Sequence, residues 1–365
     1  MITSDSGGGK AIIIMGPRQV GKTTLLTELY GNDEDCLFLN GDEADVRSMF
    51  SDISAARLKA LIGNKKTVVI DEAQRIADIG IKLKLITDQI PGVQLIATGS
   101  SSFDLANKIN EPLTGRKWEH LMYPLSFGEM VSHHGLMEEK RLLPHRLVYG
   151  YYPEVVTGQG QEKAILRQLA DSYLYKDILM WESIKHPHKI MTLLQALAFQ
   201  LGSQVSFNEL SQLCSMDAKT VEKYIVLLEQ CYVIFRLGSF SRNLRGELRS
   251  SRKIYFYDNG IRNALIANFA PVELRNDTGA LWENFMVSER QKRNAYGGVW
   301  CNKWFWRTKE QKEIDYIEES DGVLSAYEFK WSPTAKCKAP RQFLTAYPSA
   351  TFKVVNRDNF EDFLL

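Results

Sequence analysis

The feature that most constrains the fold is a short segment at residues 16–23, which directly follows an apolar run at 11–15. It reads Gly-Pro-Arg-Gln-Val-Gly-Lys-Thr and fits the pattern GxxxxGK[ST] without a mismatch. Leu25, Leu26 and Leu29 follow at helical spacing. A strand, a glycine-containing turn and a helix in this order predict a loop whose N–H groups surround phosphates.

Each part of this loop has an expected role. Lys22 is expected to reach the β- and γ-phosphates of a nucleotide, and Thr23 to ligate Mg²⁺. The glycines allow the backbone to curl around the anion. The residues expected to bind ATP are Gly16, Pro17, Arg18, Gln19, Val20, Gly21, Lys22, Thr23 and Thr24.

A second apolar run, at 67–70, ends in the adjacent acids Asp71 and Glu72. Ligands of open α/β sheets bind at the carboxyl ends of the strands, where these acids are expected to lie. We expect Asp71 to hold Mg²⁺ through water and Glu72 to polarise the attacking water. The alternative is that the two acids only cap the following helix.

Two further positions are weaker candidates for catalytic roles. A run at 94–98 ends in Gly-Ser-Ser-Ser, where Ser100 is expected to contact the γ-phosphate or the lytic water. Such a cluster is also typical of a plain turn. Arg116 is a candidate for a charge-stabilising arginine that acts within the chain or on a neighbouring copy, and the alternative is an ordinary surface arginine.

The apolar runs alternate with helical patterns as far as about residue 129, which predicts a parallel α/β sheet. The expected strands are at 11–15, 36–39, 67–70, 94–98 and 118–122. We expect four parts in the chain: an ATP-binding domain at 1–130, a helical connector at 131–189, a winged helix-turn-helix at 190–268 and a second α/β domain at 269–365.

The winged helix-turn-helix is predicted from a helix that begins at Ser206, a turn, and a helix at 218–230 followed by two β-rich runs. Val221, Tyr224, Ile225 and Leu228 recur at helical spacing and are expected to face the core. The cations proposed to contact DNA are Lys219, Lys223, Arg242, Arg245, Arg249 and Arg252, the last four in a predicted wing at 239–253. The alternative is a protein-interaction or interdomain module with a solvated loop.

The last part of the chain carries four residues at the spacing of a metal-dependent nuclease core. They are Glu283 on a predicted helix, Asp315 on a strand, and Glu328 and Lys330 on the next strand. Alternation puts Glu328 and Lys330 on one face of that strand. The set resembles the PD-(D/E)xK core, in which carboxylates bind one or two Mg²⁺ or Mn²⁺ ions and the lysine polarises water. The competing interpretation is an ancestral nuclease core kept as a scaffold or binding surface.

Taken together, these motifs resemble a prokaryotic AAA+-type ATPase family whose members end in a domain of unknown function similar to restriction-type nucleases. The shared segments are 16–23, 71–74, 98–101, 113–116 and 124–129. The resemblance implies an AAA+-like ATP-binding domain with ATP and Mg²⁺, then a winged helix, then a restriction-endonuclease-like α/β domain. Family members usually carry some two dozen residues before the first strand that help to hold the base. In this chain only ten precede residue 11, which leaves nucleotide affinity and base preference open.

Composition and net charge limit the surfaces and the cellular compartment that we expect for this chain. Forty-five Lys and Arg against 44 Asp and Glu give a net charge of +1, so any DNA-binding surface has to be local. The five cysteines are scattered without a CxxC pair, which favours a reducing compartment, and no apolar run approaches the ~20 residues of a membrane span. We therefore expect a cytoplasmic protein, with an oligomeric state left open.

Three functions follow as hypotheses. The first is an ATPase that couples its nucleotide state, ATP or ADP, to engagement of double-stranded DNA. The second is an ATP-gated, metal-dependent DNA nuclease. The third is a nucleotide-switched interaction module without a DNA role.

Overall fold

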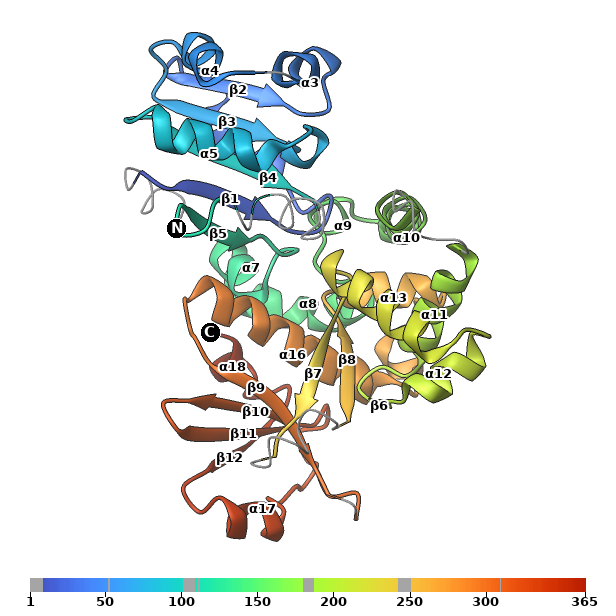
Figure 1. The fold of residues 1–365 in the computed structure, drawn as a ribbon. Helices are drawn as coiled ribbons and strands as arrows, with labels where there is room; N and C mark the ends of the chain where they lie inside the picture. The colour runs from blue at the N-terminus through green and yellow to red at the C-terminus, as the bar shows by residue number, and fades with distance from the viewer. Residues whose placement is uncertain are drawn as a thin grey trace. The chain divides into compact units, whose positions relative to one another are not determined.

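The computed structural model describes residues 9–51, 53–100, 109, 112–179, 187–241, 251–308 and 310–365 (Figure 1). The chain divides into two units. The first comprises residues 1–123 with 230–232, and the second comprises 124–229 with 233–365.

The first unit is built on five parallel strands in the order β2-β3-β4-β1-β5. The strands are β1 Ala11–Met15, β2 Cys36–Asn40, β3 Thr67–Asp71, β4 Gln94–Gly99 and β5 Lys117–Leu121. They lie where the sequence predicted them, and all neighbouring pairs are parallel. Because β1 lies between β4 and β5, the segment that follows β1 emerges at the carboxyl edge of the sheet between these two strands.

The helical segments that the structure describes beside this sheet are α2 Lys22–Tyr30, α3 Ala44–Phe50, α4 Ala55–Ile62, the 3₁₀ turn η1 Ala73–Arg75 and α5 Ile79–Gln89. Leu26 of α2 packs in a buried cluster with Ile12, Ile14, Val69 and Ile96 of the sheet. Each such side chain contributes about 1.5–3 kcal/mol of stability by leaving water. This packing fixes the start of α2, and with it the loop, against the central strands.

The second unit begins with helices. They are α7 Phe127–His134, α8 Leu136–Tyr149, α9 Pro153–Thr157, α10 Glu162–Leu179 and α11 Pro187–Phe199. Next come β6 Gln204–Val205, α12 Phe207–Leu213, α13 Ala218–Gln230, β7 Ile234–Ser239 and β8 Arg252–Phe256. Ser206 caps α12 by accepting a hydrogen bond from the Glu209 N–H, at the position where the sequence predicted a helix start.

The remaining elements are α15 Asn259–Leu265, η2 Val272–Leu274, α16 Thr278–Tyr296, β9 Asn302–Arg307, β10 Glu313–Ser320, β11 Val323–Phe329, α17 Arg341–Ala346, β12 Thr351–Val355 and α18 Glu361–Leu364. The long helix α16 contacts both β8 and β11 (Figure 1). Its residue Trp282 is completely buried.

One seven-stranded sheet runs through the second unit in the order β12-β11-β10-β9-β7-β8-β6. Its two halves meet where β7 pairs in parallel with β9, at Gly238 opposite Trp304, and the Phe240 N–H donates to the Phe305 oxygen at 2.6 Å. The domain boundary expected between 268 and 269 therefore falls inside this unit, and the sheet crosses it. Local patterns could not reveal this pairing, because its strands lie more than 60 residues apart in the chain.

Among the described residues, no helix has the length and apolar character needed to cross a lipid bilayer. All five cysteines lie in the described part of the chain, and none of them forms a disulfide.

Candidate functional site

The loop between β1 and α2 is shaped by two glycines. Gly16 has φ +152°, and a Cβ added there would lie 2.0 Å from the backbone oxygen of Met122. Gly21, directly before α2, has φ +97°. Both conformations exclude ordinary side chains, so these two positions of the predicted motif are fixed by backbone geometry.

Lys22 opens α2 and is folded back over this loop. Its ammonium donates hydrogen bonds to the backbone oxygens of Gly16 at 2.8 Å and of Pro17 at 2.7 Å, and the residue is only 5% exposed. The first turn of a helix also presents N–H groups that have no partner within the helix. The loop thus gathers positive charge and N–H donors, the groups that bind phosphate.

Thr23 lies against the acid that ends β3. Its hydroxyl donates to Asp71 Oδ2 at 2.7 Å, and Thr98 on β4 donates to Asp71 Oδ1. The Thr98 oxygen in turn accepts from the Glu72 N–H at 3.0 Å. A hydroxyl and a carboxylate held together beside a phosphate loop are the hard oxygen ligands that Mg²⁺ prefers, so these residues fit that ion.

Glu72 sits in a left-handed backbone conformation with φ +49°. The Gln74 amide donates to Glu72 Oε2 at 2.5 Å and to the Ser100 hydroxyl at 3.1 Å. The structure thus brings the two predicted residues, Glu72 and Ser100, together through Gln74. Neither Gln74 nor Thr98 was assigned a role from the sequence, although both fall inside its motifs and their polar side chains near strand ends were the available signal.

Arg116 lies elsewhere in this unit. It directly precedes β5, whose first residue pairs with Ala11 at the start of β1, so it stands at the amino edge of the sheet. Its guanidinium pairs with Asp88 at 2.6 Å and its side chain is 44% exposed. The geometry does not bring Arg116 to the phosphate loop of its own chain, which lies at the carboxyl edge. A role on a neighbouring copy stays a prediction.

The cations proposed for DNA binding differ in their exposure and in their contacts with nearby side chains. Lys219 and Lys223 are exposed on α13 and lie four residues apart, on one side of the helix. Arg252 is engaged locally, 3.6 Å from Glu222 and over the ring of Phe207. The predicted wing residues Arg242, Arg245 and Arg249 lie outside the described residues.

The four residues of the predicted nuclease core do come together in the second unit. Burial, followed by the nearby charges of Glu283 and Glu328, raises the pKa of Asp315 well above its usual value. Lys330 donates to Glu328 Oε1 at 2.7 Å. Carboxylates from α16, β10 and β11 therefore lie close enough to influence one another electrostatically.

Three residues that sequence reasoning missed complete this cluster. Lys253 on β8 reaches Glu283 at 2.8 Å and Glu313 at 2.5 Å, and the Tyr255 hydroxyl donates to Glu283 at 2.7 Å. In the part of the chain that the structure describes, no group of three or more His, Cys, Asp or Glu side chains is arranged to hold a metal ion. The expected Mg²⁺ or Mn²⁺ of this domain therefore gains no support from these residues.

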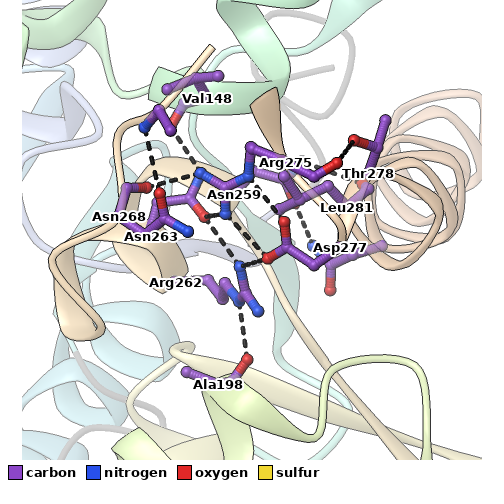
Figure 2. Close-up of polar contacts among 12 residues, drawn as sticks. Val148, Ala198, Asn259, Arg262, Asn263, Asn268, Arg275, Asp277, Thr278 and Leu281 are labelled. Carbon is purple, nitrogen blue, oxygen red and sulfur yellow. Dashed lines mark hydrogen bonds and ion pairs between the residues drawn. The ribbon is translucent and has the colours of Figure 1, made fainter. Parts of the chain in front are cut away.

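A separate polar network lies around Asp277, at the start of α16 (Figure 2). Its carboxylate pairs with Arg262 at 2.6 Å and with Arg275 at 2.8 Å. Burial raises the pKa of Asp277, but hydrogen bonds from Arg275 and Arg262 outweigh burial and lower the pKa to about 2. Arg262 also donates to the Ala198 oxygen at 2.8 Å, so the network ties α11 and α15 to the start of α16.

Comparison with known proteins divides the chain into three matched regions. Residues 8–131 match the family model of an AAA domain. Residues 140–272 and 278–363 match two domains of unknown function, DUF8612 and DUF4143.

The relatives along most of the chain are uncharacterized. One from Mycobacterium tuberculosis is 27% identical over 328 residues, which covers 88% of this chain and 70% of the relative. Another, from Methanocaldococcus jannaschii, is 23% identical over 344 residues, covering 87% and 75%.

Among solved structures, a chain from the structure of Drosophila ORC bound to AT-rich DNA and Cdc6 is 11% identical and covers 73% of this chain and 87% of that one. Its TM-score of 0.24 is too low to establish a shared fold. The AAA domain match, together with the parallel sheet that carries the phosphate loop, supports an AAA-type ATPase domain at residues 8–131.

Proposed function

We propose that the protein is a Mg²⁺-dependent ATPase whose nucleotide state controls its engagement with double-stranded DNA. The observation that carries the ATPase is the placement of the Thr23 hydroxyl 2.7 Å from Asp71 Oδ2, beside the buried ammonium of Lys22. A ligand pair for Mg²⁺ and a cation for phosphate thus lie together at the end of β1.

The roles of the chain's own residues follow from this geometry. Lys22 exchanges its bonds to the loop carbonyls for the β- and γ-phosphate oxygens of ATP. Thr23 and Asp71 would hold Mg²⁺, which neutralises charge on those oxygens. Glu72 accepts the proton of the attacking water, and the Gln74 amide keeps its carboxylate oriented toward Ser100.

Arg116 is proposed to act on the nucleotide of a neighbouring copy of the chain, since it stands at the amino edge of its own sheet. Its pairing with Asp88 is half exposed, so the guanidinium can leave it at little cost. An oligomer is therefore part of the proposal.

The DNA role rests on α13 and the elements around it. We propose that α11, α12 and α13 with β6, β7 and β8 form the winged helix, in which the exposed Lys219 and Lys223 face phosphates. Phosphate contacts supply most of the non-specific affinity for DNA. The predicted wing residues Arg242, Arg245 and Arg249 would add to the same surface.

A protein-interaction module is the second candidate, because two large apolar side chains of this region face solvent. Phe199, at the end of α11, is 71% exposed, and Leu213, at the end of α12, is 58% exposed.

A metal-dependent nuclease gains no support from the carboxylates of the second unit that the structure describes. The five free cysteines support a reducing compartment such as the cytoplasm.

The coupling is tested by duplex DNA affinity, measured by fluorescence anisotropy with the Glu72→Gln variant in ATP and in ADP. We expect the two affinities to differ about tenfold, within the usual range of coupling between sites. By linkage, DNA has to change the affinity for ATP by the same factor. Lys22→Ala is the control and should show one affinity in both nucleotides.

Equal DNA affinities in ATP and ADP would contradict the coupling but leave the ATPase standing. A wild-type protein that binds no duplex DNA at low salt would favour the interaction module.

A further inference from the structure

Lys253 is a charged side chain in an unusual place. It lies on β8, its side chain is 1% exposed, and its ammonium bridges Glu283 on α16 and Glu313 on β10 at 2.8 and 2.5 Å. The Phe305 ring lies beneath it, 5.5 Å from the ammonium to the ring centroid. A buried cation of this kind persists only where it is paired and hydrogen-bonded.

The other carboxylates of the cluster also have partners within the protein. The second oxygen of Glu313 lies 3.1 Å from Arg307. Glu328 accepts from Lys330 at 2.7 Å, and Asp315 Oδ2 accepts from the Phe329 N–H at 2.8 Å. Each of these acids thus accepts from at least one donor that the fold supplies, although Glu328 Oε2 is buried without a hydrogen-bond partner among the described residues.

We propose that Lys253 is a resident cation that stands in place of a divalent metal, so that this acidic cluster locks β8 to α16 and β10 and binds neither Mg²⁺ nor Mn²⁺. The cluster keeps the residue pattern of a metal-dependent nuclease, but its positive charge comes from a side chain.

The energetics explain why a metal does not enter. A divalent ion that bound Glu283 would have to displace the ammonium from between Glu283 and Glu313. Lys253 would then remain buried without its partners, which is strongly unfavourable. The two positive charges would also repel each other across a site with little water to screen them.

The position of Lys253 in the chain relates this cluster to the predicted wing. Lys253 is the second residue of β8 and the last residue of the predicted wing at 239–253. Anchoring β8 at this point holds the strand against α16 and β10. The acids of the nuclease-like pattern then serve a structural purpose.

The proposal is tested by exchanging the resident cation for an added one. In Lys253→Met the cluster loses its ammonium, and we expect the Tm of the metal-free protein to fall by about 10 °C. Millimolar Mn²⁺ should restore most of this loss in Lys253→Met but should leave the Tm of nucleotide-free wild type unchanged. Mn²⁺ electron paramagnetic resonance on the same samples reports binding directly.

Two control variants make the result specific. Lys253→Met/Asp315→Asn should lose the recovery by Mn²⁺, because it removes a carboxylate that the added ion needs. Lys303→Met, a lysine on β9 that bonds to Gln291 and not to the cluster, should show no Mn²⁺-dependent recovery. If Lys253→Met does not fold, Lys253→Gln keeps a polar donor at this site and serves in its place.

Two outcomes would overturn the proposal. One is a wild-type protein that binds Mn²⁺ and loses this binding in Asp315→Asn, because the cluster would then hold a metal with Lys253 present. The other is a Lys253 variant that folds and gains no Mn²⁺ binding, because the lysine would then not be what excludes the ion.

Discussion

At the scale of single residues, the second unit contains buried charges that pair with side chains of opposite charge. Asp277 is the clearest case, since the side chains of Arg262 and Arg275 that it neutralises are almost fully buried (Figure 2). Removing one member of such a group leaves the others charged and unpaired in a medium of low polarity. The arrangement should therefore be sensitive both to substitution and to pH.

We expect Asp277→Asn to lower the free energy of unfolding by about 3 kcal/mol at neutral pH. The pKa of Asp277 is about 2 in the folded protein, below the ~3.9 of an unfolded aspartate. A lowered folded pKa contributes stability that is complete above the unfolded value and is lost as pH falls from about 4 toward 2. Denaturant unfolding from about pH 6 down to about pH 3 measures both effects.

Asp277→Asn should therefore lose less stability than wild type between about pH 4 and pH 3. The exposed Asp358→Asn is the matched control and should follow wild type. Identical pH profiles for wild type and Asp277→Asn would contradict this role of the network.

The residues of the phosphate loop and of β3 were predictable because a motif of fixed spacing specifies them. Their partners were not, and Lys253 shows why. It bonds Glu283, 30 positions away, and Glu313, 60 positions away, so no local pattern connects them. The sequence pattern placed Lys253 in a solvated wing, whereas the fold buries it.

At the scale of elements, α13 has a buried apolar side and an exposed side that carries two lysines. Val221, Tyr224, Ile225 and Leu228 are buried, which confirms the prediction from their spacing. Lys219 and Lys223 lie on the exposed side. A helix with a fixed apolar face and paired cations on the opposite face can present those cations without a change in its packing.

We expect Lys219→Ser/Lys223→Ser to weaken duplex DNA binding about tenfold, by a similar factor for different sequences, because phosphate contacts carry no base information. The slope of log affinity against log salt should fall by about 2, one for each lost contact. Fluorescence anisotropy across a salt series measures both quantities.

Lys336→Ser/Lys338→Ser removes the same charge from another exposed segment and should leave the affinity unchanged. A double α13 variant with the wild-type salt slope would place the DNA surface elsewhere.

Sequence patterns predicted the strands of the first unit but not the pairing of β7 with β9 in the second. Four of the five parallel strands of the first unit were predictable because each is a short apolar run bounded by turns. The exception is β5, which reads Lys-Trp-Glu-His-Leu. The pairing of β7 with β9 was not predictable, because it spans only two residue pairs, Gly238 with Trp304 and Ser239 with Phe305. Those two pairs make one sheet out of what the sequence suggested were two.

At the scale of the whole molecule, the candidate chemistry lies in the first unit, whereas the proposed DNA surface and the Lys253 cluster lie in the second. The phosphate loop, the β3 acids and the AAA domain match agree on a nucleotide site within residues 8–131. The proposed function therefore depends on whether this site binds Mg-ATP through the residues that the geometry assigns.

Isothermal titration calorimetry of Mg-ATP into wild type, Glu72→Gln and Lys22→Ala tests this most directly. Wild type and Glu72→Gln should bind with similar affinity, because Glu72 acts on the attacking water and not on the phosphates, while only wild type turns ATP over. Lys22→Ala should bind at least about tenfold more weakly, because it loses a charge-assisted contact to the phosphates. Wild type without detectable binding at millimolar Mg-ATP, or Lys22→Ala with undiminished affinity, would contradict the proposed nucleotide site.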